Sequence, residues 1–185
     1  CDQVFNLRKN TIQMAADKKI MNPEVCDAYA FLITRYDPGP RSSLGLSNPR
    51  VDGIVKLNPD FALALAKMIK ATPFNFRINS AYRTDNPSSN HFKGCAVDLQ
   101  YGCAGRCSQD SCNSAGCQWT LANSGQFGLQ IRMKYAPEWN HIEPANLRAC
   151  QTNGPGVGDP VSGLPSSNVS NAIRQAVAPQ PVPAP

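Results

Sequence analysis

Two segments in the first half of the chain carry apolar residues at the spacing of an amphipathic helix. Each segment opens with Asn followed by Pro, at Asn22-Pro23 and at Asn58-Pro59, and these residue types are typical of helix starts. We expect one helix between Asn22 and Asp37, and a second, largely apolar helix between Asn58 and Pro73. Residues 39–53 are rich in Pro, Gly and Ser, so we expect them to form a surface loop.

Short apolar stretches, the first with strict alternation of apolar and polar residues, predict strands at residues 74–79, 95–99, 127–133 and 139–142. Residues 119–123 fit a short helix, and residues 2–21 fit one or two more. A chain in which helices precede strands is typical of the α+β class. We therefore predict N-terminal helices packed on a small, mainly antiparallel sheet.

Two segments are expected to lie outside this core. Residues 102–118 contain four cysteines among Gly, Ser, Asn and Asp, which predicts an irregular insertion held by cross-links or by metal. Residues 153–185 contain seven of the 16 prolines and are typical of a linker or tail. We expect one domain over residues 1–152, followed by this tail.

Composition and charge exclude some classes of function. Of the 185 residues 42% are hydrophobic, yet no apolar run is long enough for a transmembrane segment. The net charge of +5 is not focused in any basic run longer than two residues, so no nucleic-acid partner is expected. Eight cysteines favour an oxidising, extracytoplasmic location, whether periplasmic, secreted or virion-associated.

The chain has only two histidines, and each lies near a carboxylate in the sequence. Asp98 follows His91 by seven positions, and Glu138 precedes His141 by three. A catalytic zinc site needs three such ligands, an open position for water and a free carboxylate nearby. A histidine taken singly is more often a partly buried polar residue, so this inventory alone leaves both interpretations open.

Three motifs around these residues resemble those of a zinc peptidase family. They read Ser80-Ala-Tyr-Arg-Thr84, Ser89-Asn-His-Phe-Lys-Gly-Cys-Ala-Val-Asp98 and Glu138-Trp-Asn-His-Ile-Glu143. The family comprises D-alanyl-D-alanine carboxypeptidases and dipeptidases and L-alanyl-D-glutamate endopeptidases, which share their fold with hedgehog domains. The resemblance covers about residues 77–144 and implies a peptidase, either carboxypeptidase or endopeptidase, that acts on stem peptides of bacterial peptidoglycan. The setting would be a cell wall or a phage virion, with the tail as a tether to a larger assembly.

The resemblance also implies roles for individual residues. His91, Asp98 and His141 would bind one catalytic Zn²⁺, and Glu138 would be the general base. Arg83 matches the arginine that polarises the substrate carbonyl or binds a carboxylate, with a salt bridge at the strand end as the alternative.

Further residues near the motifs are candidates for contact with the substrate. Ser89 would bind substrate or brace its loop, and Tyr82 and Trp139 would line the cleft or pack in the core. Many relatives place a Trp immediately before the last His, whereas this chain has Asn140 there, so the cleavage-site preference stays open. Glu143 would orient a metal ligand, and Gly94 would permit close approach of the backbone.

The cysteines allow two interpretations. Disulfides within residues 102–118, with recruitment of Cys95 or Cys150, are the favoured one, and a Cys-rich structural metal site is the other. Strand alternation puts Cys95 and Asp98 on opposite faces, so we expect Cys95 to pack rather than to bind metal.

An alternative function is a non-catalytic, zinc-containing binding or structural module of a cell-wall-associated or phage virion protein. Such a module has no need for a free carboxylate at Glu138, so this residue favours the enzyme. Nucleic-acid binding by the Cys-rich segment has little support, because residues 102–118 contain a single Arg.

Overall fold

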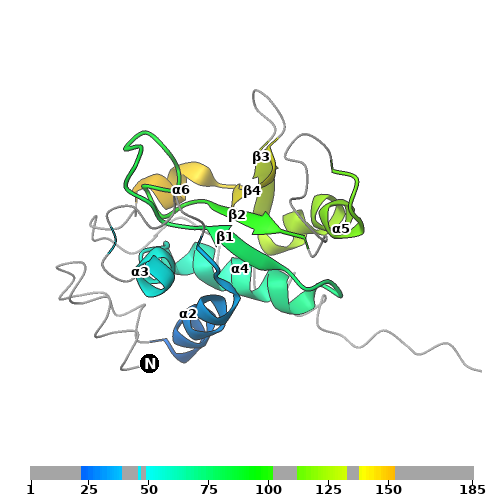
Figure 1. Cartoon of the computed structure of the whole chain (residues 1–185), viewed down its shortest axis with the longest axis horizontal. Helices are drawn as coiled ribbons and strands as arrows, with labels where there is room; N and C mark the ends of the chain where they lie inside the picture. Colours follow the sequence, from blue (N-terminus) through cyan, green and yellow to red (C-terminus); the bar gives the residue numbers. More distant parts are fainter. Residues whose placement is uncertain (1–21, 39–45, 47–48, 102–111, 133–137, 153–185) are drawn as a thin grey trace, which may run out of the picture.

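A four-stranded antiparallel sheet forms the centre of the structure. The computed structural model describes residues 22–38, 46, 49–101, 112–132 and 138–152 (Figure 1). The strands are Arg77–Ser80 (β1), Val97–Gln100 (β2), Leu129–Arg132 (β3) and Glu138–Pro144 (β4), in the order β1-β2-β4-β3. Every neighbouring pair is antiparallel, which confirms the predicted α+β class and the character of the sheet.

Alternation along the strands gives this sheet one apolar and one polar face. Val97, Leu99 and Ile142 are buried in the hydrophobic core, together with Leu129 and Ile131 of β3. The residues between them, which include Asp98, His141 and Glu143, therefore project from the opposite face. The functional candidates that lie on strands are thus separated from the core by the sheet itself.

The two long helices cover the apolar face, on one side of the sheet (Figure 1). They are Pro23–Arg35 (α2) and Pro59–Ala71 (α4), which confirms both predicted helices. Asn22 and Asn58 are their N-caps, and each side chain accepts hydrogen bonds from backbone N–H groups of the first turn. No helix in the described part of the chain is long and apolar enough to cross a membrane.

The loop predicted over residues 39–53 is wrong for its last part, because Pro49–Val55 forms a helix (α3). Residues 39–45 and 47–48 of the predicted loop lie outside the described residues. Its Pro occupies the first turn, where the missing N–H costs nothing, and Ile54 and Val55 are fully buried. Gly53 lies against the ring of Tyr36, where a Cβ atom would come within 2.6 Å of the ring. Pro49 and Gly53 are therefore not loop residues: Pro49 starts the helix, and Gly53 permits close packing against Tyr36.

The first strand begins later than predicted, at Arg77 rather than at residue 74. The N–H of Phe76 donates to the carbonyl of Phe74 at 3.1 Å, a tight turn that interrupts the extended chain. The two rings stack with centroids 6.3 Å apart. The predicted alternation in 74–79 therefore reflects core packing of Phe76 and Ile78, of which only Ile78 lies on the strand.

The second half contains more helix than predicted. Ala115–Asn123 (α5) begins four residues before the predicted start, since Ser114 caps it by accepting from the N–H of Cys117. The end of the predicted irregular insertion is thus helical. A 3₁₀ helix at Ser124–Phe127 (η2) and a helix at Leu147–Thr152 (α6) were not predicted. The predictions for residues 2–21, 102–111 and 153–185 lie outside the described residues.

Two disulfides connect described cysteines. Cys95 and Cys150 link the segment before β2 to α6, and Cys112 and Cys117 form a short loop at the start of α5. The predicted disulfide in the Cys-rich segment is confirmed for the second pair. Cys95 is packed in the core, as expected, but it pairs with Cys150 rather than with a cysteine of that segment.

The loop that leads into β2 is anchored to the helices at Gly94. This residue has a φ of 69°, and its carbonyl accepts from the N–H of Asn58 at 2.9 Å. A Cβ atom here would collide with the backbone carbonyl of Lys56. Gly94 is therefore required for both conformation and space, as the sequence predicted.

Gly94→Ala is expected to destabilise the protein by at least about 2 kcal/mol, because it combines left-handed strain with a backbone clash. Gly128→Ala is the matched control, since Gly128 has a φ of 70° with no atom near its Cβ position. It should cost only the strain, about 1 kcal/mol. Chemical denaturation of both variants measures the difference, and equal losses would show that the contact at Lys56 is unimportant.

Candidate metal centre

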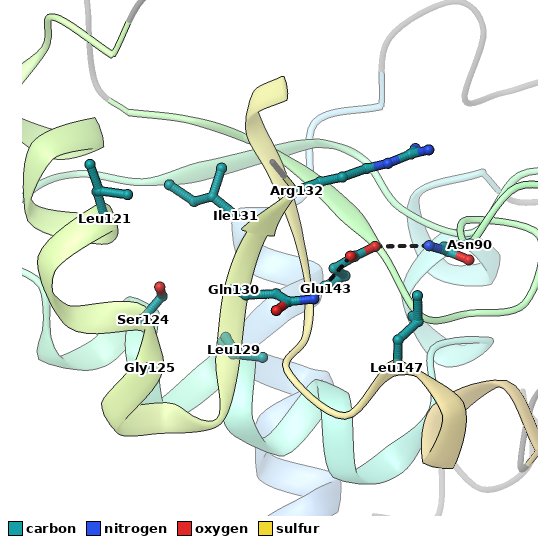
Figure 2. A pocket seen from close by; sticks show the side chains of 10 residues that line it. All are labelled: Asn90, Leu121, Ser124, Gly125, Leu129, Gln130, Ile131, Arg132, Glu143 and Leu147. Atoms are coloured by element: carbon teal, nitrogen blue, oxygen red, sulfur yellow. Dashed lines mark hydrogen bonds between the residues drawn. The ribbon is translucent and has the colours of Figure 1, made fainter. Parts of the chain in front are cut away.

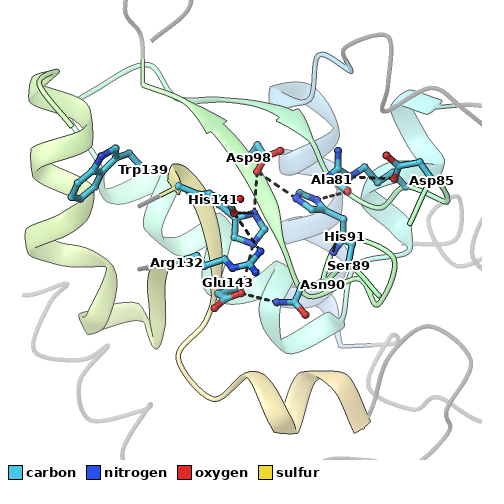
Figure 3. A network of polar contacts seen from close by, with 12 residues as sticks. Ala81, Asp85, Ser89, Asn90, His91, Asp98, Arg132, Trp139, His141 and Glu143 are labelled. Carbon is cyan, nitrogen blue, oxygen red and sulfur yellow. Dashed lines mark hydrogen bonds and ion pairs between the residues drawn. The ribbon is translucent and has the colours of Figure 1, made fainter. Parts of the chain in front are cut away.

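Asp98 and His141 lie directly opposite each other on adjacent antiparallel strands. Side chains of such a pair project from the same face of the sheet, so the carboxylate of β2 meets the imidazole of β4. Asp98 Oδ1 is 3.2 Å from His141 Nδ1. This pair forms the base of the candidate metal centre on the polar face (Figure 3).

His91 approaches the same carboxylate from the loop that Gly94 anchors. Its Nδ1 lies 2.9 Å from the carbonyl oxygen of Ala81, and since a carbonyl only accepts, Nδ1 carries the proton. Its Nε2 then faces Asp98 Oδ1 at 3.4 Å. A neutral imidazole in this tautomer turns a lone pair toward a carboxylate, which requires a proton or a cation between them.

His91, Asp98 and His141 together form a group that can hold a metal ion. One donor atom from each lies within 4.8 Å of the others, and both imidazoles are buried. Nε2 of His91 is buried without a hydrogen-bond partner among the described residues. Two imidazole nitrogens and a carboxylate oxygen suit a transition metal such as zinc, and three protein donors leave a position open.

Glu143 lies behind His141 on the same face of β4. Its carboxylate accepts hydrogen bonds from Asn90 Nδ2 at 2.8 Å and from Gln130 Nε2 at 3.1 Å. Oε2 is 3.6 Å from His141 Nε2, on the side of the ring away from Asp98. A carboxylate in this position fixes the orientation of a metal-binding histidine, which fits the role that the sequence predicted for Glu143.

The charges of the cluster compensate one another. Burial by itself would raise the pKa of Asp98, but its hydrogen bond with His141 and the positive charge of that imidazole, together with the contact to His91 when a proton lies between them, hold this pKa well below its ordinary value. Burial would lower the pKa of His141, but Asp98 and Glu143 raise it to about 9. Burial likewise opposes ionisation of Glu143, whose pKa is nevertheless lowered by His141 and Asn90. Without metal the cluster therefore keeps a proton on His141, which a metal ion must displace.

Glu138 faces the metal group because β4 is irregular. Residues three apart on a regular strand project from opposite faces, which would separate Glu138 from His141. Here Ile131 pairs with Ile142 while Arg132 pairs with Glu138, so residues 139–141 have no counterpart on β3. As a result Glu138 Oε2 lies 3.7 Å from His141 Nδ1 and 3.3 Å from Arg132 Nη1.

Arg83 and Ser89 lie in the loops beside His91, where the structure gives both of them local partners. Arg83 Nε is 3.5 Å from Asp85 Oδ1, which matches the alternative of a salt bridge at the strand end. The hydroxyl of Ser89 accepts from the N–H of His91 at 3.2 Å, which matches the alternative of loop bracing. Contact of either residue with a substrate stays a prediction.

The two aromatic candidates lie on different sides of the centre. Tyr82 stacks on Phe92 with centroids 6.0 Å apart and lies under Lys56 Nζ, next to the loop of His91. Burial raises the pKa of its phenol. Trp139 points away from His141 toward α5 and packs against the core, the alternative that the sequence left open (Figure 3). Its backbone carbonyl accepts from the hydroxyl of Tyr101 at 2.5 Å.

The sequence analysis did not predict four residues that contribute to the site. Asn90 and Gln130 hold Glu143, Arg132 pairs with Glu138, and the carbonyl of Ala81 orients His91. The sequence does carry a signal for Gln130 and Arg132. They are the polar residues of the alternating segment Leu129–Arg132, which predicts that both project from the polar face of the sheet. A backbone carbonyl carries no sequence signal, because every residue has one.

Comparisons of the chain with protein-family models, with curated proteins and with solved structures find no match. What the geometry defines is an α+β domain whose polar sheet face carries a buried His/Asp/His group. The resemblance to zinc peptidases therefore rests on the three sequence motifs.

Asp98→Asn is expected to weaken zinc binding by more than about 100-fold, because it removes the anionic ligand between both imidazoles. Asp85→Asn is the matched control, as Asp85 pairs with Arg83 outside the metal group. Competition with a chromophoric chelator measures both affinities. Equal affinities for the two variants would place zinc elsewhere in the chain.

Thermal stability of the metal-free protein is expected to fall as pH rises from about 6.5 to about 9. His141 has a raised pKa in the folded state, so its contribution is fully present below its ordinary value of 6.5 and is lost as pH passes about 9. Asp98 has a lowered pKa, so its contribution is lost only in acid, below its ordinary 3.8.

Zinc should reverse this trend, since it binds neutral His141 and competes with fewer protons at higher pH. Melting curves with chelator and with zinc test both statements, and His141→Gln should be insensitive to pH over this range when metal-free. A metal-free protein that becomes more stable across the range would contradict the assigned charge of His141.

Proposed function

We propose that the chain is a zinc-dependent peptidase that hydrolyses peptide bonds in the stem peptides of bacterial peptidoglycan. The observation that carries this proposal is the carboxylate of Glu138, placed 3.7 Å from His141 beside a His/Asp/His group. A structural metal site is closed by its ligands, whereas this group has three donors and a further carboxylate next to them. The substrate class comes from the motif resemblance.

The donor set suits zinc, and each proposed ligand is held by a separate part of the fold. The carbonyl of Ala81 orients His91, the strand register places Asp98, and Glu143 lies behind His141. A zinc ion bound there would supply Lewis acidity, which polarises a carbonyl and acidifies water. Glu138 would accept a proton from the attacking water and return it to the leaving amine.

The surroundings of Glu138 are consistent with this role. Its side chain is 51% exposed, so the carboxylate is open to water and to a substrate, while its pairing with Arg132 limits the directions in which it points. Arg83 is proposed to contact the substrate carbonyl or a carboxylate, which would require it to exchange its contact with Asp85.

The cellular setting follows from the same proposal. The described disulfides, Cys95–Cys150 and Cys112–Cys117, form and persist in oxidising compartments. An enzyme of peptidoglycan would work outside the cytoplasm, in a bacterial envelope or as part of a phage particle. Carboxypeptidase and endopeptidase action on the stem peptide both fit the site, and the products distinguish them.

Glu138→Gln is expected to lower turnover by about 10²- to 10⁴-fold while zinc affinity stays unchanged, because the amide cannot accept the proton. Glu24→Gln is the control, since Glu24 is an exposed acidic residue of α2 that pairs with Lys67. Mass spectrometry of soluble products from peptidoglycan, with zinc and with chelator, gives the readout and identifies the bond.

Chelator-sensitive release of D-Ala or of peptide fragments would support the peptidase. Zinc-loaded protein that releases no products would favour the non-catalytic binding module. Release of products at the full rate by Glu138→Gln would show that Glu138 is not the general base, although the protein would still be a peptidase.

A further inference from the structure

A pocket of about 880 Å³ opens beside the metal centre, along strand β3 (Figure 2). Leu121, Ile131 and Leu147 give it apolar walls, while Gln130, Arg132 and Glu143 contribute polar groups. Its volume lies in the range of small-molecule and peptide side-chain sites. None of the three proposed metal ligands lines it, so it is distinct from the metal position itself.

Two contacts and one neighbour in the sequence connect this pocket to the metal centre. Glu143 lines the pocket and lies 3.6 Å from His141, and Arg132 lines it and lies 3.3 Å from Glu138. Asn90 also lines it and precedes His91 in the loop. A peptide bound with its scissile bond at the centre would therefore place a neighbouring residue in this pocket.

Among the described residues that line the pocket, Arg132 is the only positively charged one. Glu143 is the only negatively charged one in this described set, and its carboxylate already accepts from Asn90 and Gln130 and faces His141. Its side chain is also just 7% exposed. Of the charged groups in the described lining, the guanidinium of Arg132, which contacts Glu138 through Nη1 alone, is therefore the one with donors left for an anionic ligand.

The guanidinium of Arg132 makes one ion pair with the described residues and keeps donors to spare. Nη1 contacts Glu138 at 3.3 Å, and no other hydrogen bond or ion pair joins Arg132 to the described residues. A guanidinium has five N–H donors in a planar fork, which matches the two oxygens of a carboxylate.

We propose that Arg132 is a specificity residue that binds a carboxylate of the peptide in this pocket. This inference rests on the proposed function, because stem peptides supply carboxylates both at the C-terminus and on D-glutamate. It assigns Arg132 to the carboxylate because Arg132 lines the pocket and Arg83 does not, which leaves the substrate carbonyl as the partner proposed for Arg83. The apolar walls would contact the aliphatic part of the same peptide residue.

The test compares three synthetic stem tetrapeptides: one with all carboxylates free, one with a C-terminal amide and one with the D-glutamate α-carboxyl as an amide. Calorimetry measures their binding to the full chain without zinc, in which zinc-dependent hydrolysis cannot consume them. The proteins are the wild type, Arg132→Gln, Arg132→Lys and Arg77→Gln. Arg77 is the matched control, as an exposed sheet arginine that pairs with Asp37 away from the pocket.

One of the two amides is expected to bind about tenfold more weakly than the free acid to the wild type and to Arg77→Gln, since it loses a charge-assisted pair. In Arg132→Gln the difference should shrink to less than about twofold, and Arg132→Lys should be intermediate because it keeps charge without the fork. With zinc, the same ratio should appear in KM for the wild type.

Equal binding of all three peptides to the wild type, or a preference that survives in Arg132→Gln, would overturn the assignment. Hydrolysis with a KM ratio independent of Arg132 would overturn it too, while the proposed peptidase stands. The expected binding pattern without any hydrolysis by the zinc-loaded protein would support Arg132 as a carboxylate-binding residue and would contradict the proposed peptidase activity.

Discussion

The antiparallel register of β2 against β4 is the constraint on which the rest of the site depends. It pairs Val97 with Ile142 on the core side and Asp98 with His141 on the polar side. A slip by one residue would exchange these faces, burying the polar pair and exposing the apolar one. The hydrophobic core therefore fixes the geometry of the metal group, although no core residue contacts it as a ligand.

Burial of the cluster is possible because every charge in it faces an opposite one. Asp98 lies between the imidazoles of His91 and His141, and His141 lies between Asp98 and Glu143. The carboxylate of Glu143 in turn accepts hydrogen bonds from the side-chain amides of Asn90 and Gln130. Removing one member would leave a buried charge without compensation, which costs far more than a surface ion pair contributes. A divalent cation that replaces the proton on His141 adds one positive charge and still faces the carboxylates of Asp98 and Glu143, so the same arrangement can serve both the metal-free and the metal-bound protein.

The sequence predicted the elements with the clearest periodicity and the residues with distinctive chemistry. The Asn-Pro caps identified α2 and α4, and the two histidines with Asp98 lie together as the motifs implied. It failed where tertiary contact overrides local signals, as at Gly53, whose missing Cβ admits the ring of Tyr36 within a helix. It also missed the bulge in β4, because a register shift depends on the partner strand, and without it Glu138 would project away from His141.

X-ray absorption spectroscopy of the zinc-loaded full chain tests the central claim most directly. The account predicts two imidazole nitrogens and a carboxylate oxygen at about 2.0–2.2 Å, with a further light ligand such as water. His91→Gln should change this spectrum, because it removes one imidazole from the shell. Sulfur neighbours at about 2.3 Å would instead place the metal on cysteines and contradict the proposed centre.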